Sequence, residues 1–336
     1  MIQDPLLPGP ATNSIEERNL IGAIVDDLLA RSAREEYCTW LEDHRDPRLS
    51  AAQLLAKLAR SCKTEAKKRP WRSSNLTGFN RAWCDMLGFT PLQAIAEDES
   101  CWNSRALILK YLKPCIGIVP TMESHSEMSA TKSRFGGLPA LPPNQNWPEC
   151  EEGPLQFIAQ VSLDDIQFFQ ASRCLPQSGL LSFFALNGNV GGCMHRLDGQ
   201  AFFYDKLQEL QLRQCPSGCE FPQSAACKLN FIEAWDLPDS RDLLVKQTDR
   251  DKLGQCDDLF AELRYGWQPF RSHFLGYVRH SRSDDPSPNA NYANLFRAGS
   301  YVSTGWSWAD DENLSYYLPS EDFGNCNLEK VRANAS

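Results

Sequence analysis

The chain has 336 residues, of which 42% are hydrophobic and 23% are charged. This composition is typical of a globular protein, and the length predicts two domains. Apolar runs such as Ile21–Val25 and Cys115–Val119 are much shorter than the roughly 18 residues that a membrane span needs. The first residues lack the basic and apolar regions of a secretory signal. We therefore expect a cytoplasmic protein with no membrane partner.

The negative charge is concentrated in the second part of the chain. Residues 1–115 carry 16 Lys or Arg and 15 Asp or Glu, whereas residues 116–336 carry 18 and 28. An acidic domain repels phosphate backbones, so we expect no nucleic-acid partner. It attracts a basic protein surface, although solubility is an equally simple reason for the charge.

Thirteen cysteines are scattered along the chain without a CxxC pair. In a cytoplasmic protein we expect free thiols, most of them in small apolar packing roles. The densest group offers an alternative, because zinc needs about four soft ligands in tetrahedral reach. The candidate zinc ligands are Cys193, Cys215, Cys219 and Cys227. We expect no other cofactor.

Helical patterns dominate the chain up to residue 113. Ser14 followed by Glu17 predicts a capping box, and an apolar stripe from Ile15 to Leu28 has helical spacing. Further helices are predicted over Ala33–His44, around Leu54–Leu58, from Thr90-Pro91 onward and over Trp102–Leu112. The basic run Lys67–Arg72 is read as a solvated loop.

From Cys115 onward, short apolar or aromatic runs bounded by Gly, Pro, Asn and Asp predict strands. One helix is predicted among them, over Cys256–Tyr265. The irregular mixture favours an α+β fold with a helical N-terminal region, 1–113, and a mixed or antiparallel sheet domain, 114–336. The predicted strands are Ile116–Val119, Leu155–Val161, Leu180–Leu186, Ala201–Tyr204, Leu229–Trp235 and Phe274–Val278.

A loose internal repeat lies within the sheet domain. The pair LQFIAQVSLDD and LPQSGLLSFFALNGN resembles the later pair NLFRAGSYVSTGW and DENLSYYLPSEDF. Each pair is consistent with two neighbouring strands. The repeat favours two similar lobes, with any cleft between them.

The most distinctive segment runs from Ser133 to Pro143, with the letters SRFGGLPALPP, and is followed by Asn146-Trp147-Pro148. Adjacent glycines relax the backbone, whereas the prolines fix φ and remove donors. We expect a rigid, irregular loop anchored by Phe135 and Trp147. A phosphate loop is disfavoured because no Lys-Ser/Thr follows and GxGxxG is absent.

Several motifs resemble the YwqG-like family, a bacterial domain family of unknown function. FGGLPALP, NWP, PLQFIAQVSLDDI and LPQSGLLSFF match its first part, and HFLGY from His273 and Trp308-Ala309-Asp310 match its later part. The resemblance covers about residues 107–334. Ala309 stands where the family pattern has glycine, and Leu295–Ala298 departs from its LLLQ strand.

A second resemblance is brief. Residues 37–47, with the letters YCTWLEDHRDP, are similar to the YADWLEERGDP stretch of a short bacterial repeat-companion domain. The physical interpretation needs no family, because Tyr37, Trp40 and Leu41 share one helix face and Asp46-Pro47 ends the helix.

No catalytic signature emerges, so we expect a binding module rather than an enzyme. The leading hypothesis is an acidic, aromatic-lined surface that recognises a protein with a basic surface, in an antagonist or immunity-type role. The alternative is a small-ligand binder or an enzyme that uses a cleft beside the FGGLP loop, where Arg134 and Gln160 meet His273 or Asp310. The candidate binding residues are Arg134, Phe135, Gly136, Gly137, Pro139, Trp147, Gln160, His273, Trp308 and Asp310.

Overall fold

A computed structural model describes most of the chain, and it divides into two compact units. The helical unit comprises Met1–Pro114 and Glu233–Gln268, and the sheet unit comprises Cys115–Ile232 and Pro269–Ser336. The segment Glu233–Gln268 belongs to the helical unit, although the sequence analysis assigns residues 114–336 to the sheet domain. The described residues are 14–63, 80–97, 103–122, 129–186, 199–216, 226–238, 246–254, 272–277, 291–300 and 313–335.

The α+β class is confirmed, with helices over the first part of the chain and a large antiparallel sheet after them. No helix in the described ranges combines the length and the apolar character that crossing a bilayer requires. The predicted helix Cys256–Tyr265 and the basic run Lys67–Arg72 lie outside the described residues.

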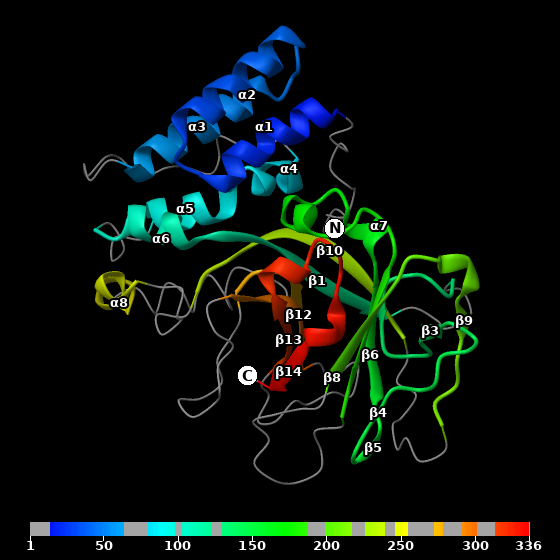
Figure 1. The fold of residues 1–336 in the computed structure, drawn as a ribbon. Helices are drawn as coiled ribbons and strands as arrows, with labels where there is room; N and C mark the ends of the chain where they lie inside the picture. Colours follow the sequence, from blue (N-terminus) through cyan, green and yellow to red (C-terminus); the bar gives the residue numbers. More distant parts are fainter. Residues whose placement is uncertain are drawn as a thin grey trace. The chain divides into compact units, whose positions relative to one another are not determined.

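The helical unit contains the predicted helices with small shifts at their ends. α1, α2 and α3 pack in succession (Figure 1). Pro91 lies in the first turn of α5 rather than at its first position, and α6 starts three residues after the predicted Trp102. The helices are α1 (Ile15–Asp26), α2 (Arg31–Asp43), α3 (Leu49–Lys63), α4 (Arg81–Met86), α5 (Phe89–Glu97), α6 (Arg105–Tyr111) and α8 (Gln247–Gly254).

The first helix begins as predicted, but its apolar stripe is shorter. The Ser14 side chain accepts a hydrogen bond from the Glu17 backbone N–H at 3.4 Å. The Glu17 carboxylate is buried, and it accepts a hydrogen bond from the Tyr37 hydroxyl at 2.8 Å and pairs with Arg48 at 2.9 Å. Ile15 is 76% exposed, so the prediction that it belongs to the packed stripe is wrong. The apolar face through which α1 packs therefore begins after its first turn.

The sheet unit is built on one ten-stranded sheet, in the order β14-β13-β12-β11-β1-β10-β2-β6-β7-β8. The strand pairs whose registers are described in this sheet are antiparallel. The strands are β1 (Lys113–Met122), β2 (Arg134–Phe135), β6 (Gln156–Ser162), β7 (Leu180–Ala185), β8 (Gly199–Tyr204), β10 (Cys227–Asp236), β11 (Ser272–Phe274), β12 (Tyr292–Gly299), β13 (Asn313–Pro319) and β14 (Arg332–Ala335).

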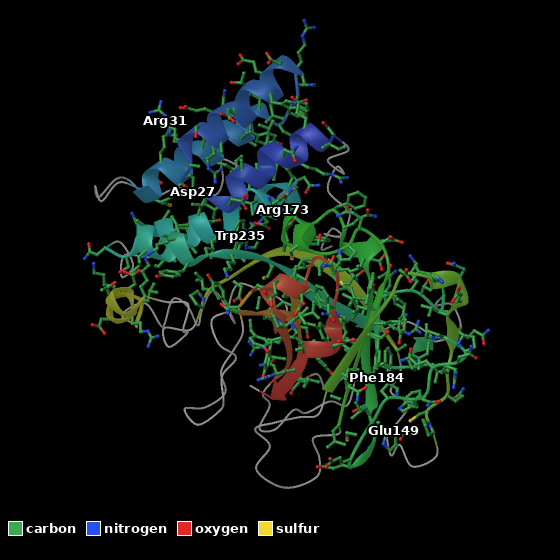
Figure 2. All side chains as sticks on the ribbon, in the orientation of Figure 1. Asp27, Arg31, Glu149, Arg173, Phe184 and Trp235 are labelled. Carbon is green, nitrogen blue, oxygen red and sulfur yellow. The ribbon has the colours of Figure 1, made fainter. Side chains whose placement is uncertain are left out.

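Smaller elements complete the unit. The two-stranded sheets pair β3 (Ala140–Leu141) with β9 (Gln211–Leu212) and β4 (Glu149–Cys150) with β5 (Gly153–Pro154). Figure 2 labels Glu149 on the β4–β5 hairpin. The turn after β6 forms α7 (Leu163–Ile166) and a short 3₁₀ segment over Gln170–Cys174.

The predicted internal repeat is present as two matching sets of five strands. The strands β1, β2, β6, β7 and β8 correspond in chain order to β10, β11, β12, β13 and β14, because the sheet order reads the same from both ends. The β6–β7 hairpin has a bulge between Phe157 and Ala159, and the β12–β13 hairpin has one between Asn294 and Phe296. The repeats therefore share their local irregularities as well as their order.

Individual hydrogen bonds repeat in the two sets. Ser133 Oγ accepts from the Ser162 N–H at 2.9 Å, and Ser272 Oγ accepts from the Gly299 N–H at 2.8 Å. The residue after each short strand has a left-handed backbone, with φ of 62° at Gly136 and 66° at Leu275. This correspondence equates Arg134 with His273, and Gln160 with Arg297.

The repeats exchange their first strands and do not form separate lobes. β1, which opens the first repeat, pairs with β11 of the second, and β10, which opens the second, pairs with β2 of the first. Both repeats also supply the same apolar core, whose centre holds the rings of Phe135, Phe183, Phe274, Phe296 and Tyr316. The repeats therefore do not form the two lobes that the sequence predicts, because both belong to one sheet and share a single apolar core.

The curled sheet closes where β8 meets β14. These strands stand at opposite ends of the hydrogen-bonded order, yet they contact each other. A Cβ atom added at Gly199 would lie 2.4 Å from the Ala333 Cβ. Glycine is therefore the residue that allows the two strands to approach.

Candidate functional site

The FGGLP loop is anchored to the sheet at its start. Arg134 and Phe135 form β2, which lies between β6 and β10. Gly136 and Gly137 follow with φ of 62° and 71°, in the left-handed region that glycine tolerates. The Gly136 N–H donates to the Ile158 carbonyl at 2.9 Å. The rigid, irregular loop is confirmed, and its first two residues belong to the sheet.

The Arg134 side chain is buried against the loop that contains it. Its Nε donates to the Leu138 carbonyl at 3.2 Å, and one terminal nitrogen donates to the Ser129 carbonyl at 3.1 Å. Burial lowers the pKa of Arg134 to about 10, because the charged form loses hydration. The guanidinium therefore holds the loop closed by binding its carbonyl groups.

Gln160 binds the same loop from the neighbouring strand. Its side chain is fully buried, and its Oε1 accepts from the Ala140 N–H at 3.2 Å. Its Nε2 donates to the carbonyls of Ala130 at 2.7 Å and Lys132 at 2.8 Å. Both polar ends of the amide are therefore used by the loop and by the residues just before it.

The two predicted aromatic anchors lie on opposite faces of the sheet. Phe135 belongs to the central core with Phe183, whereas Trp147 packs edge-on against Phe184 with ring centroids 5.8 Å apart. Adjacent residues of a strand point to opposite faces, so Phe183 and Phe184 mark the two sides. The Trp147 N–H donates to the Leu155 carbonyl at 2.8 Å. Phe184, which is labelled in Figure 2, belongs with Trp147 to a separate apolar cluster.

His273 does not meet Arg134 and Gln160 as a strand neighbour. It lies on β11, where it is buried and directly opposite Arg297 of β12. Strands β1 and β10 stand between β11 and β2 in the sheet. Trp308 and Asp310, the remaining members of the predicted site, lie outside the described residues.

The cysteines differ from the expectation at one position. Cys38, Cys62, Cys84, Cys115, Cys150, Cys174, Cys227 and Cys326 are free thiols, as predicted. Cys215 is disulfide-bonded, so the expectation of a free thiol is wrong there.

The zinc alternative draws no support from the part of the chain that is described. No group of three or more His, Cys, Asp or Glu side chains in these ranges could hold a metal ion. A sulfur in a disulfide offers no thiolate, and Cys227 points into the apolar core opposite Phe135. Cys193 and Cys219 lie outside the described residues.

The turn that follows β6 carries an exposed aromatic ring that sequence reasoning missed. Leu163 and Ile166 of α7 are buried, whereas Phe168 is 45% exposed and Asp164 is exposed. The Ser133 hydroxyl donates to the Asp165 carboxylate at 2.7 Å and so ties this turn to the FGGLP loop. The sequence does carry a signal for this exposure, because Phe168 does not continue the i, i+3 spacing of the apolar residues Leu163 and Ile166.

Charge on the described part of the sheet unit is nearly balanced. Exposed acids such as Glu151, Glu152 and Asp205 are matched by exposed bases such as Lys228 and Arg332. The acidic excess of residues 116–336 therefore lies mainly outside the described residues and in the helical-unit segment Glu233–Gln268. The described aromatic rings of the sheet unit are mostly core residues rather than a surface lining.

The comparisons with known proteins identify the domain. The model of a domain of unknown function, DUF1963, matches residues 133–336, so the chain belongs to this family. The match begins at Ser133, the residue that ties the FGGLP loop to β6 and α7, and β1 precedes it although β1 is part of the same sheet. No curated protein matches the chain.

Proposed function

We propose that the DUF1963 domain of this chain is a YwqG-like binding module that recognises a basic segment of another protein. The α7 turn provides the contact surface, with Phe168 as the aromatic anchor and Asp164 as the charge. An antagonist or immunity-type role is the natural extension of this activity. The cytoplasm is the proposed compartment.

The observation that carries the proposal is the exposure of Phe168. Phe168 is 45% exposed although it lies within two residues of the buried Ile166. An exposed aromatic ring and an exposed carboxylate on the same turn can each attract Lys or Arg side chains, through cation–π and charge interactions. The turn is also held in place, because the Asp165 carboxylate accepts from Ser133 and lies 3.9 Å from Lys132. A preorganised turn loses little entropy on binding.

The alternative, a small-ligand site or an enzyme beside the FGGLP loop, has less support. It requires Arg134 and Gln160 to present polar groups to a ligand, and these groups bind Ser129, Leu138 and other backbone groups of the loop itself. It also requires them to meet His273, whose strand β11 is separated from β2 and β6 by β1 and β10 in the sheet order.

Fluorescence anisotropy with a labelled arginine-rich peptide tests the proposal. We expect the full chain to bind the peptide at low salt and more weakly at physiological salt, because screening reduces charge attraction. Phe168→Ser should weaken binding about tenfold, as expected for the loss of an aromatic anchor. Asp164→Lys should also weaken binding of the peptide, and this effect should be larger at low salt than at high salt.

Two matched controls distinguish binding at this surface from nonspecific binding of the peptide. Leu212 is 48% exposed in the same unit, so Leu212→Ser removes a comparable apolar surface elsewhere. Asp205 is an exposed acid on the turn after β8, so Asp205→Lys repeats the charge reversal at another place. Both variants should bind like the unmodified chain. Equal binding by Phe168→Ser and the unmodified chain would rule the surface out.

A further inference from the structure

The second repeat places three polar side chains in one row across neighbouring strands. His273 of β11 lies directly opposite Arg297 of β12, and Arg297 lies directly opposite Ser315 of β13. Phe274 and Phe296, their neighbours in the chain, belong to the core, so the row points to the other face of the sheet. All three row residues are at most 8% exposed. Opposite residues of neighbouring strands are close enough to interact, so the row brings three polar groups together.

Asn294 adds a fourth polar group to this face. It lies opposite Tyr317, which is two residues from Ser315 on β13, so Asn294 points to the same face as the row. The Asn294 Nδ2 donates to the Leu275 carbonyl at 2.8 Å. Its Oδ1 is buried, and no donor in the described part of the chain reaches it. A buried acceptor without a partner is costly, so this oxygen calls for a donor from outside these residues.

The first repeat shows that the fold does not require these polar groups. Phe157 precedes the bulge of β6 as Asn294 precedes that of β12. It packs against Phe184 in an apolar cluster, with ring centroids 5.4 Å apart. The position of Arg297 in the row is taken by Gln160, a neutral amide whose two polar ends bind backbone groups. The second repeat therefore has a cation and an unused acceptor where the first has an amide and a packed ring.

The four groups together indicate the kind of ligand that fits them. A guanidinium is charged at any physiological pH, and an imidazole carries at least one N–H donor in either tautomer. With a serine hydroxyl they offer donors to the oxygens of an anion, in hydrogen bonds that charge makes stronger than neutral ones. The Asn294 Oδ1 accepts instead, so the anion must keep one O–H of its own. Hydrogen phosphate has such a group at neutral pH, whereas sulfate has none.

We propose that the face of β11, β12 and β13 opposite the core binds a small oxyanion that carries one hydroxyl, of the type of inorganic phosphate. Arg297, His273 and Ser315 donate to its oxygens, and Asn294 accepts from its hydroxyl. A free anion fits better than a phosphate group on a large molecule, because each of these side chains is at most 8% exposed. The inference does not depend on the proposed binding surface at Phe168.

Isothermal titration calorimetry of the full chain, dialysed free of phosphate, tests the ligand without any variant. Inorganic phosphate, sulfate and phenyl phosphate are titrated separately at pH 7 and equal ionic strength. We expect phosphate to bind, and sulfate to bind at least about tenfold more weakly, because a sulfate oxygen that faces the Asn294 Oδ1 is repelled. Phenyl phosphate should bind more weakly because of its bulk. No binding of phosphate, or equally tight binding of either other anion, would overturn the proposal.

Variants assign the binding to this face. Arg297→Gln introduces the residue of the first repeat and should weaken phosphate binding about tenfold or more. Asn294→Leu removes the acceptor and should reduce the preference for phosphate over sulfate. Arg173→Gln is the control, because it removes an exposed arginine elsewhere in the sheet unit (Arg173 is labelled in Figure 2). It should bind phosphate like the unmodified chain.

Thermal unfolding shows whether each variant is folded and supplies a second measure of binding. Phosphate should raise the melting temperature of the unmodified chain and of Arg173→Gln, because a ligand that binds only the folded state stabilises it. The same phosphate concentration should leave the melting temperature of Arg297→Gln nearly unchanged. An equal rise in Arg297→Gln and in the unmodified chain would mean that phosphate binds elsewhere, and it would overturn the proposal.

Discussion

Arg45 follows helix α2 in a left-handed backbone conformation, with φ of 50°. Two hydrogen bonds close the helix end around it, from the Arg45 N–H to the Glu42 carbonyl at 3.0 Å and from the Asp46 N–H to the Leu41 carbonyl at 2.8 Å. This is a Schellman motif, which usually has glycine at the left-handed position. The repeat-companion pattern that residues 37–47 resemble has glycine at the same place.

Replacing Arg45 tests the strain at this position. Arg45→Gly should stabilise the helical unit by about 1 kcal/mol, because a Cβ atom makes the left-handed conformation costly. Urea unfolding followed by circular dichroism measures the change. Arg45→Ala is the control, since it removes the same charge and keeps the Cβ atom. An equal gain from both variants would show that charge, not backbone strain, is responsible.

At the scale of the strands, the two repeats differ most clearly inside the core. Phe183 of β7 corresponds to Tyr316 of β13, and both rings pack against Phe296. The Tyr316 hydroxyl is fully buried and has no hydrogen-bond partner among the described groups. Burial raises the pKa of Tyr316 well above its ordinary value, because the charged form loses hydration. The second repeat therefore carries a polar group that the first omits.

Exchanging these two side chains measures the cost of that hydroxyl. Tyr316→Phe should stabilise the sheet unit by about 1 kcal/mol, since an unsatisfied buried hydroxyl costs roughly that much or more. Phe183→Tyr should destabilise it by at least a similar amount. The measurement is the free energy of unfolding in urea. Destabilisation by Tyr316→Phe would mean that the hydroxyl has a partner in solution, such as a bound water.

At the scale of the whole sheet unit, the exchanged first strands interlock the two repeats. β1 and β10 are neighbours at the middle of the sheet, and each also pairs with a strand of the other repeat. The far ends of the sheet then meet at β8 and β14, where Gly199 faces Ala333. Neither repeat can bury its apolar face alone, so we expect the unit to unfold cooperatively.

The contact between Gly199 and Ala333 can be tested by adding and removing one methyl group. Gly199→Ala places a Cβ atom 2.4 Å from the Ala333 Cβ and 3.2 Å from the Tyr316 ring. It should destabilise the unit by about 1–3 kcal/mol, which thermal unfolding can measure. The double variant Gly199→Ala with Ala333→Gly should recover most of the loss.

A glycine in open space provides the control. Gly324 has nothing within 4 Å of its added Cβ atom, so Gly324→Ala should change stability by less than about 0.5 kcal/mol. If Gly199→Ala were equally mild, β8 and β14 would not be in close contact in solution.

The helices and the long strands follow from local sequence patterns. Helix α2 was predicted within two residues, because Tyr37, Trp40 and Leu41 recur at helical spacing and the periodicity is a property of the segment itself. Strands β6 and β7 were found because their residues are apolar throughout and bounded by turn residues. The repeat was visible in the sequence because both hairpins keep the same apolar pattern.

What each polar side chain does was decided only by tertiary structure. Arg134 and Gln160 have the side chains of a ligand site, and in the fold they bind nearby backbone carbonyls, those of Leu138 and Ala130. Strand β2 has two residues, too few for a periodic pattern, and it exists through pairing with β6 and β10. Periodicity records which face of a segment is apolar, whereas hydrogen-bond partners and strand neighbours depend on residues distant in the chain. The sequence alone therefore determined the elements and their duplication, and the tertiary structure decided the strand exchange and the partners of buried polar groups.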